Sequence, residues 1–387
     1  LASPLFMNSD PNSTVEPDSI LYNPFDDTYY EAMEEQGQHM ENAGAPLDGT
    51  PLSPLENAAI KVLAPKLGFD YIKMPVVFTG GNIMSDGRGS IISTAVLINE
   101  NRFMGMPEKD FYSYVSENLG VDTYSVISNY EDLGIQHVDC FLKMVDEETL
   151  IVTRAPKDHP YHERFENIVN YELKALRTCY GNPYRIFRVD AARYDGDDLT
   201  AYANSYILNK KVYVPMYGIA QDSIALEQWQ AAMPGYEIKG FLYNHSECSE
   251  NEWLGVYETE TGWSGFDVIH CRTRSVWDRD MLYMSVKRIA ECVPAQDGYQ
   301  VDVNIVDYSD AGLIAEKLQL FWRIKGKESW NVLPLEKSKT NEVYSAVIPG
   351  APVGTEIEYY AHASDHSGRE ESMPRTSPKG FYTFKIS

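Results

Sequence analysis

The sequence predicts two folded parts, a mixed α/β domain over residues 1–295 and an all-β sandwich over residues 296–387. Two observations favour this division. Between about residue 55 and residue 295, segments with the alternating pattern of strands are interleaved with segments of helical periodicity. After residue 296 only short strand patterns remain, separated by turn residues. A chain of 387 residues is long enough to form a large core and a second module.

Three segments of the first part each predict a strand, a polar turn and a second strand, and they cover residues 93–106, 137–156 and 205–217. Their similar form indicates one supersecondary unit used several times. Helical patterns lie between or after them, at residues 107–119, 161–180, 222–233 and 276–290. Such a chain forms a propeller-like domain if the units close on themselves. Periodicity alone does not distinguish this closed form from an open α/β sheet.

Two of the helical patterns place apolar side chains on one face, which we expect to be buried. At residues 107–119 this face carries Phe111, Tyr114 and Val115. At residues 161–180 it carries Ile168, Tyr171, Leu173 and Leu176.

The C-terminal part shows alternating apolar residues in five clear runs, at residues 301–305, 318–324, 343–348, 357–363 and 381–386. Turn residues separate the runs, and about seven short strands without a helix are typical of an immunoglobulin-like sandwich. No cysteine lies in this segment, so we expect its core to hold without an internal disulfide.

The charge of the chain bears on its partners. The net charge of −24 argues against nucleic acid and anionic lipid, because binding to phosphate needs a positive field. It is compatible with a cationic substrate, although we expect most of these charges only to keep the surface soluble. The sequence contains no apolar run of about 18 residues, so we expect no membrane span.

The cysteines, one acidic stretch and the first residues narrow the class of protein further. Five cysteines without a Cys-x-x-Cys pair argue against a zinc site and against a dense disulfide framework, and they leave at least one thiol unpaired. The acidic stretch 195–198 lacks the spaced ligands of a calcium loop, so we expect an ordinary turn. The sequence opens at Leu1 without the pattern of a signal peptide, and we expect this start to follow a processing boundary.

Two short segments carry a base, a carboxylate and a thiol: residues 137–139 (His-Val-Asp) and 269–271 (Ile-His-Cys). Both are predicted to be extended, and alternation then points the side chains of His137 and Asp139 the same way. A histidine can activate a thiol and later a water, while a carboxylate holds a positive group. This combination suits attack on the electron-poor carbon of a guanidinium group.

Five motifs occur in the order seen in agmatine deiminases and bacterial peptidylarginine deiminases, and the chain resembles this family over about residues 55–290. The motifs are Gly80-Gly81-Asn82 with Ser85-Asp86-Gly87, then 137–139, Ala203-Asn204-Ser205, Met233-Pro234-Gly235 and 269–273. With the sandwich added, the whole chain most resembles the secreted peptidylarginine deiminase type of an oral bacterium. The resemblance implies a pentein fold, a five-bladed α/β propeller with the site on its axis, in an extracellular or cell-surface protein.

The resemblance also implies roles for individual residues. Cys271 would attack the guanidinium carbon, and His137 would protonate the departing ammonia and then activate water. Asp139 would hold two guanidinium nitrogens, and Asn204 would orient the cysteine or the substrate. We expect the substrate-binding side to include Gly81, Asn82, Asp86 and His270, with Gly81 allowing a close backbone approach and Asp86 equally suited to a turn. No metal or cofactor is needed, since nucleophile, base and anchor are side chains.

One family motif, Trp-x-Arg-Asp-x-Gly-Pro, has no full match here, and its aspartate is the second guanidinium-binding carboxylate. We therefore expect an incomplete first blade, completed by a separate N-terminal polypeptide if the enzyme is processed. The acidic segment 24–38 has no Arg or Lys, which favours agmatine-like amines or internal arginines over a terminal carboxylate. Two alternatives stay open: amidino transfer to an amine, and an inactive pentein that serves as a binding or adhesion module.

Overall fold

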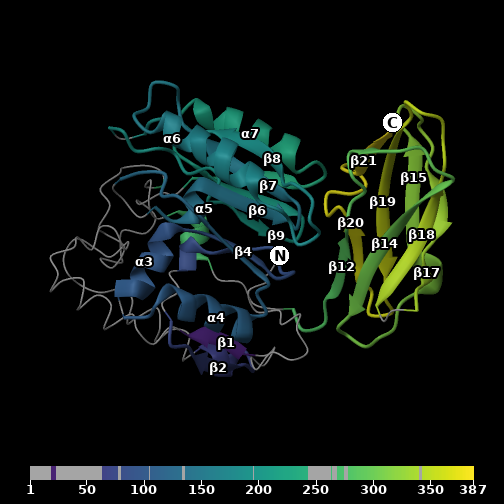
Figure 1. The fold of residues 1–387 in the computed structure, drawn as a ribbon, viewed down its shortest axis with the longest axis horizontal. Coiled ribbons are helices and arrows are strands. Elements are labelled where there is room, and N and C mark those ends of the chain that lie inside the picture. Colours follow the sequence, from purple (N-terminus) through teal and green to yellow (C-terminus); the bar gives the residue numbers. More distant parts are fainter. Residues whose placement is uncertain are drawn as a thin grey trace. The chain divides into compact units, whose positions relative to one another are not determined.

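The computed structural model describes residues 19–22, 63–76, 80–103, 105–132, 136–194, 196–242, 263, 268–273, 278–339 and 342–387 (Figure 1). The chain divides into two compact units. The N-terminal unit takes residues 1–229 and 238–277, and the C-terminal unit takes residues 230–237 and 278–387. Within the described ranges, no helix is both long and apolar enough to cross a membrane.

The N-terminal unit repeats one arrangement of strands and helices three times. The first copy pairs β3 (Met84–Ser85) with β4 (Ser90–Thr94), and α3 (Ala95–Phe103) and α4 (Glu108–Leu119) then lead to β5 (Thr123–Ile127). The second has β6 (Leu142–Asp146), β7 (Thr149–Arg154), α6 (His162–Asn167) and β8 (Arg185–Asp190). The third has β9 (Tyr206–Leu208), β10 (Lys211–Met216), α7 (Gln221–Ala232) and β11 (Glu237–Leu242).

The hydrogen bonding explains why this arrangement is one unit. In the first two copies the opening strands are antiparallel, and the last strand runs parallel to the second. A parallel neighbour needs a crossover, and the helices supply it. This confirms the prediction of a repeated supersecondary unit. Whether five such units close into a propeller stays a prediction. A further parallel pair joins β1 (Ser19–Tyr22) to β2 (Asp70–Lys73).

The helix predicted at residues 107–119 is confirmed as α4. It follows Pro107, whose fixed φ suits a helix start, and it ends at Gly120 in the left-handed conformation. Phe111 and Val115 are fully buried in a cluster with residues of β4 and α3, and Tyr114 packs against that cluster. The hairpin predicted at residues 205–217 is confirmed as β9 and β10, with Asn209 and Lys210 at positive φ in its turn.

The predictions for residues 93–106 and 276–290 were wrong. Residues 93–106 do not form two strands, because β4 ends at Thr94 and the helix α3 follows directly. Residues 276–290 do not form a helix, because β12 (Leu282–Val286) occupies the middle of this range. All five residues of β12 are buried, so the strand has no polar face and its sequence lacks the alternation by which strands are recognised.

The helix predicted at residues 161–180 is present in three pieces. After α6 come the π-helical turn η4 (Ile168–Glu172) and the 3₁₀ turn η5 (Leu173–Ala175). Ile168 and Leu173 are buried as predicted, whereas Tyr171 is 75% exposed. A π turn winds more residues into each turn than an α-helix, which rotates the residues after its start off the expected face.

The C-terminal unit is all-β and consists of two sheets around one core. The first orders β12, β14 (Gly298–Asp307), β18 (Val343–Pro349) and β17 (Glu336–Lys337). The second orders β13 (Cys292–Val293), β21 (Tyr382–Ile386), β19 (Glu356–Ser364), β15 (Gln319–Ile324) and β16 (Asn331–Pro334), with β20 (Glu370–Met373) also on β19. Both sheets contribute to one buried cluster. The five predicted strand runs are confirmed, and the immunoglobulin-like class stays a prediction.

Candidate active site

The segment around His137 and Asp139 is a helical turn and not the extended strand that its sequence predicted. His137 has an extended backbone and precedes α5 (Val138–Phe141), and the Cys140 amide donates to the His137 carbonyl at 3.1 Å. Residues 269–271 likewise lie in the four-residue helix α8 (Ile269–Arg272). Single helical turns are too short to show a period in sequence. The two predictions of extended structure were therefore wrong.

His137 and Asp139 nevertheless face a common point, and Gly81 marks it. A Cβ added to Gly81 would lie 2.8 Å from Asp139 Oδ2 and 2.8 Å from His137 Nδ1. Gly81 lies in the 3₁₀ turn η3 (Gly80–Asn82). The glycine is needed here because the backbone approaches both side chains, which agrees with the close approach expected from the sequence.

Asn82 links the first and second repeats. Its Oδ1 accepts hydrogen bonds at 3.0 Å from the Thr94 amide, the Thr94 hydroxyl and the Val138 amide. The Val138 amide is at the start of α5, where a helix leaves its amide groups without internal partners. Asn82 is fully buried and therefore fixes the position of α5. These contacts make Asn82 a positioning residue rather than a direct ligand of the thiol.

Asp139 is a fully buried carboxylate with one oxygen still open. Its Oδ2 accepts from His270 Nδ1 at 2.9 Å and from Cys271 Sγ at 3.5 Å. Its Oδ1 has no hydrogen-bond partner among the described residues. Burial acts to raise the pKa of Asp139, but the hydrogen bond and charge of His270, together with His137 and Lys143, leave it below the usual value. Asp139 is therefore an anion that can still accept a donor.

Asn204 connects the thiol to the neighbouring backbone. Its Nδ2 donates to Cys271 Sγ at 3.2 Å and to Cys140 Sγ at 3.5 Å, and its Oδ1 accepts from the His270 amide at 2.8 Å. The loop that carries Asn204 is held by Trp229 Nε1, which donates to the Tyr202 carbonyl at 3.0 Å. Asn204 therefore fixes both sulfurs relative to the start of α8.

His137 is buried and neutral over most of the pH range. Burial lowers its pKa to about 4, although the charge of Asp139 acts in the opposite direction. Neither ring nitrogen has a partner within the described part of the chain. Buried polar atoms are almost always hydrogen-bonded, so an imidazole without partners on the same side as the Asp139 carboxylate indicates a place where a polar ligand binds.

The site residues hold equivalent positions in the three repeats. Asn82 lies just before β3, Asp139 lies in the turn just before β6, and Asn204 lies just before β9. The structure thus brings together seven of the residues selected from the sequence: Gly81, Asn82, His137, Asp139, Asn204, His270 and Cys271.

Asp86 lies elsewhere. Its Oδ1 accepts from the amides of Arg88 at 2.7 Å and Ser90 at 2.9 Å, which closes the turn between β3 and β4. Burial and then the charge of Asp86 raise the pKa of Cys179 above its usual range. No described contact joins Asp86 to His137, Asp139 or Cys271. Asp86 therefore shapes the hairpin turn, and the expectation that it binds substrate gains no support.

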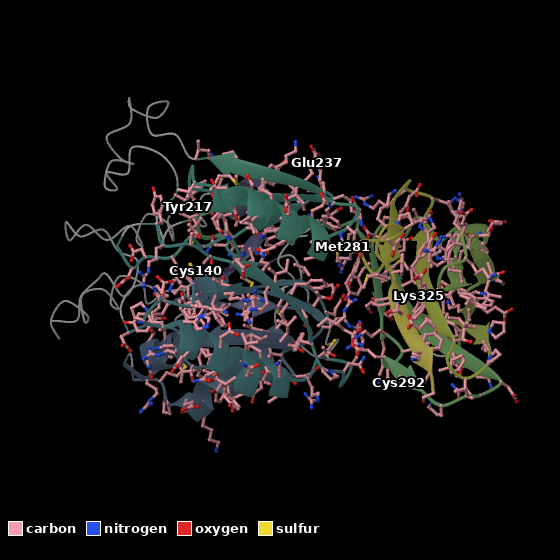
Figure 2. All side chains as sticks on the ribbon, turned by 90° about the horizontal axis from the view of Figure 1, so that it is seen from above. Cys140, Tyr217, Glu237, Met281, Cys292 and Lys325 are labelled. Atoms are coloured by element: carbon pink, nitrogen blue, oxygen red, sulfur yellow. The ribbon has the colours of Figure 1, made fainter. Side chains whose placement is uncertain are left out.

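Two residues of the site were missed in the sequence. Cys140 was not among the candidate residues, yet it lies inside the N-terminal unit, and the Asn204 amide contacts its sulfur (Figure 2). Its hydrogen bond with Cys271, then burial, raise its pKa well above the usual value. Lys143 is also buried, and burial lowers its pKa to about 8 against the opposing charges of Asp139 and Cys271. The only available signal was proximity in sequence to Asp139.

A metal ion has one plausible set of ligands here. Atoms of Asp139, Cys140 and Cys271 lie within 4.8 Å of one another, the one such group among the described residues. Both sulfurs already accept from the Asn204 amide, a donor that competes with a cation for the same lone pairs. The acidic segment 24–38, considered in the sequence, falls outside the described residues.

Several proteins of similar sequence carry the name "Putative agmatine deiminase". A protein of Legionella pneumophila strain Paris named "Putative agmatine deiminase" is 26% identical over 179 residues, which are 43% of this chain and 51% of that protein. The chain thus spans about half the length of the curated relatives that it matches.

Two solved structures are similar in part. The "Putative Arginine Deiminase from Porphyromonas gingivalis" has 28% sequence identity and a TM-score of 0.41, covering 48% of this chain and 58% of that one. The agmatine deiminase of Enterococcus faecalis has 18% identity and a TM-score of 0.47, covering 57% of this chain and 63% of that one.

A family model also matches the chain. The model of Porphyromonas-type peptidyl-arginine deiminases covers residues 50–246, which include the three repeats and all site residues except His270 and Cys271. This match extends over half of the chain, and the chain belongs to the Porphyromonas-type peptidyl-arginine deiminase family.

Proposed function

We propose that this protein hydrolyses a guanidinium group to a ureido group and ammonia through a covalent intermediate on Cys271. One observation carries the proposal: the buried anion Asp139 keeps one oxygen open while its other oxygen lies 3.5 Å from Cys271 Sγ. A buried carboxylate is costly unless donors satisfy it. A guanidinium supplies paired N–H donors and a positive charge, and it brings an electrophilic carbon next to the thiol.

The first half of the reaction forms the covalent bond. The neutral imidazole of His137 accepts the proton of the Cys271 thiol, and the thiolate adds to the central carbon of the guanidinium. The imidazolium then gives this proton to one guanidinium nitrogen, which leaves as ammonia while a thiouronium remains on Cys271. The low pKa of His137 supports this order, because an imidazole that starts neutral can take the proton.

The second half returns the enzyme to its starting state. His137 accepts a proton from a water molecule, whose oxygen adds to the thiouronium carbon. The carbon–sulfur bond then breaks while the hydroxyl group of the adduct loses its proton to solvent, so that the neutral ureido product leaves. The proton on His137 returns to the Cys271 sulfur. Asn204 stabilises the sulfur as an anion in both halves through its 3.2 Å contact.

The substrate class and the fold complete the proposal. We infer a pentein propeller, because three repeats each place a site residue just before their first strand, as expected for units arranged around one axis. We infer a peptidyl-arginine, arginine or agmatine substrate. The family name supports the first of these, and the relatives named for agmatine support the last. An extracellular location remains part of the proposal by its likeness to a secreted enzyme.

Ammonia and ureido product measured together test the proposal. The wild type, Cys271→Ala and Cys292→Ser are incubated with agmatine, arginine and arginyl peptides. Cys292 is an exposed thiol of the C-terminal unit and serves as the matched control. We expect equal amounts of both products from the wild type and from Cys292→Ser, and neither from Cys271→Ala.

Other outcomes would contradict the proposal in different ways. Equal product from the wild type and Cys271→Ala would exclude the covalent role of Cys271. Transfer of the amidino group to an added amine, without ammonia in proportion, would favour an amidinotransferase. Silence of the wild type towards every substrate would favour a binding module.

A further inference from the structure

Two cysteine side chains, Cys140 and Cys271, lie next to each other at the candidate active site. Their sulfurs are within 4.8 Å of each other, and neither forms a disulfide in the part of the chain that the structure describes. The same nitrogen, Asn204 Nδ2, donates to Cys271 Sγ at 3.2 Å and to Cys140 Sγ at 3.5 Å. The two thiols are also hydrogen-bonded to each other. The deimination uses only Cys271, so the second thiol has no role in that reaction.

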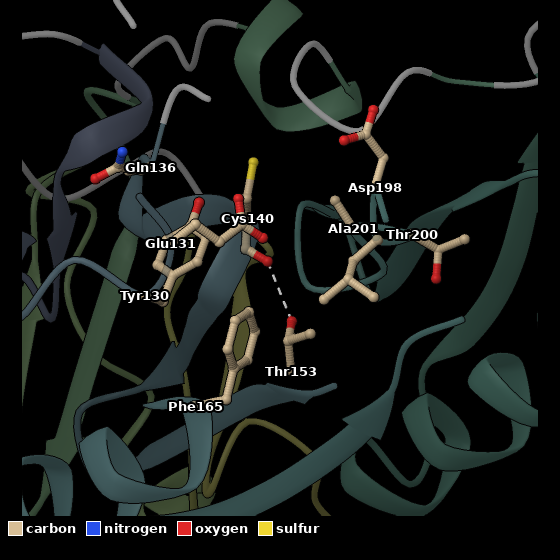
Figure 3. A pocket seen from close by; sticks show the side chains of 10 residues that line it. Tyr130, Glu131, Gln136, Cys140, Thr153, Phe165, Asp198, Thr200 and Ala201 are labelled. Atoms are coloured by element: carbon tan, nitrogen blue, oxygen red, sulfur yellow. Dashed lines mark hydrogen bonds between the residues drawn. The ribbon is translucent and has the colours of Figure 1, made fainter. Parts of the chain in front are cut away.

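The backbone that carries Cys140 is held on both sides. Its amide donates to the His137 carbonyl at 3.1 Å, and its carbonyl accepts from the Thr153 hydroxyl at 3.1 Å (Figure 3). Figure 3 shows the Cys140 sulfur pointing away from Thr153 and Phe165. The fixed backbone therefore keeps this sulfur on the side of Asn204, where Cys271 also lies.

The surroundings of the two sulfurs differ. Cys140 is 8% exposed, whereas Cys271 is half-buried. The hydrogen bond with Cys271, then burial, raise the pKa of Cys140 well above its usual value, so Cys140 keeps its proton. Cys271 gives its proton to His137 in the proposed function. Because peroxides react with accessible thiolates, Cys271 is the sulfur that a peroxide oxidises first.

We propose that Cys271 and Cys140 form a redox pair, in which a peroxide oxidises Cys271 and Cys140 then closes a reversible disulfide with it. This inference goes beyond the deimination and rests on the proposed function only for the proton transfer to His137. A disulfide places its sulfurs about 2 Å apart, so the two sulfurs have to approach by less than about 3 Å. Rotation of the two side chains between staggered positions can supply this movement.

The oxidation takes two steps. The Cys271 thiolate attacks one oxygen of hydrogen peroxide, the oxygen–oxygen bond breaks, and the hydroxide takes the proton from His137 and leaves as water. Cys271 is then a sulfenic acid. The Cys140 sulfur attacks the Cys271 sulfur, the sulfur–oxygen bond breaks, and the hydroxyl group leaves with the Cys140 proton as a second water. The two sulfurs together lose the two electrons that the peroxide gains.

The second thiol determines whether the oxidation can be reversed. Without it, further peroxide converts a sulfenic acid to sulfinic and sulfonic acids, which thiols do not reduce. A disulfide is instead opened by a thiol, which restores both cysteines. Cys140 therefore protects the nucleophile from permanent loss.

Mass spectrometry tests the pair without an assay of activity. The protein is reduced with dithiothreitol, separated from it and treated with hydrogen peroxide, and the remaining thiols are alkylated in denaturant before digestion. We expect the peptide with Cys140 to be joined to the peptide with Cys271, with the loss of two hydrogen atoms. In Cys140→Ser we expect Cys271 to carry the added oxygens of a sulfinic or sulfonic acid.

Cys179→Ser and Cys292→Ser are the matched controls. Cys179 is a partly buried thiol of the N-terminal unit, and Cys292 is an exposed thiol of the C-terminal unit. We expect both variants to form the link between Cys140 and Cys271 to the same extent as the wild type. A link from Cys271 to any other cysteine would overturn the proposal. The same result follows if wild-type Cys271 becomes a sulfinic acid as fast as it does in Cys140→Ser.

Recovery of activity tests what the pair does in the enzyme. The wild type and Cys140→Ser are inactivated with peroxide and then reduced with dithiothreitol, and each is compared with its own starting rate. We expect the wild type to regain most of its rate and Cys140→Ser to regain at most about a tenth. Cys140→Ala repeats the comparison without placing a hydroxyl group in the interior. Equal recovery in the three proteins would contradict the protective role of Cys140.

The two measurements separate this inference from the proposed function. A wild type that releases no ammonia but forms the link between Cys140 and Cys271 would refute the deimination and leave the redox pair. An active wild type in which peroxide oxidises Cys271 without this link would refute the redox pair and leave the deimination.

Discussion

At the scale of single residues, the site depends on polar groups that the fold buries without satisfying them. Asp139 Oδ1 and both nitrogens of His137 have no partner among the described residues, and both side chains are almost completely buried. Such groups lower the stability of the folded chain. A bound substrate that pairs with these groups removes this cost. The site therefore favours a ligand that donates hydrogen bonds to Asp139 and exchanges a proton with His137.

Histidine 137 should make the fold sensitive to acid. An unfolded histidine titrates near pH 6.5, and in the folded chain burial lowers the pKa of His137 to about 4. Between these pH values the unfolded chain binds more protons, so stability falls as the pH drops from about 6.5 to about 4. Glutamine does not titrate, so the free energy of unfolding of His137→Gln should fall less over this window. We expect the difference from the wild type to be at most about 3 kcal/mol.

Urea unfolding at several pH values measures this difference. His366→Gln, a change at an exposed histidine of the C-terminal unit, serves as the control and should follow the wild type. Identical pH dependence in His137→Gln and in the wild type would show that His137 is not held neutral by burial.

Asp139→Asn should remove activity while it keeps the shape of the side chain. An amide in this position no longer carries the charge that attracts a guanidinium, and one of its two ends becomes a donor that faces the substrate. We expect kcat/KM to fall roughly 100-fold or more, as when a positioning contact is lost. Steady-state assays against Asp197→Asn, a change at an exposed aspartate, check this, and a fall of less than threefold would contradict the role of Asp139.

At the scale of elements, short turns position the chemistry and long strands and helices support them. η3, α5 and α8 are three or four residues long, and they carry Gly81, Asp139 and Cys271. Such turns depend on contacts from other segments, as the bond from the Val138 amide to Asn82 illustrates. Their geometry therefore arises only when the repeats pack together.

The difference between long elements and short turns explains how much of the structure the sequence predicted. Elements with a clear pattern, such as α4 and the hairpin of β9 and β10, were predicted correctly. β12 was not, because burial on all sides removed its alternation. The residues of the site were selected largely from motifs, whereas their helical turns and the contact of Asn204 with two sulfurs depend on packing between distant segments. Cys140 and Lys143 were missed because nothing local distinguishes them.

Gly81→Ala should damage the site more than the fold. The added methyl would lie 2.8 Å from both Asp139 Oδ2 and His137 Nδ1, well inside contact distance. We expect the two side chains to move apart and kcat to fall roughly 100-fold. Activity and urea unfolding are measured on the same preparation. A variant that keeps full activity would show that the backbone at residue 81 does not limit the geometry of the site.

At the scale of the whole molecule, the chain carries a net charge of −24, and we propose that its site binds cations. A negative field raises the local concentration of positive substrates and increases their association rate, and salt screens this effect. The net negative charge thus favours the association of positive ligands, in addition to keeping the protein soluble.

Salt dependence should rank substrates by charge. Agmatine carries two positive charges near neutral pH, and free arginine carries a net charge of one. We expect kcat/KM to fall with added sodium chloride for both, more steeply for agmatine. Rates measured from low salt to about 0.5 M, where the screening length is only a few ångströms, check this. Equal slopes would show that the overall field does not guide the substrate.

The strand β12 also limits where the polypeptide can be divided. Its residues pair with β14 along five positions, from Leu282 with Asp307 to Val286 with Val303. A fragment that began at residue 296 would strip β14 of this neighbour and leave a long row of unmet amide and carbonyl groups. Open rows of this kind recruit strands from other molecules, so such a fragment would tend to aggregate. A soluble C-terminal fragment must therefore start upstream of Leu282.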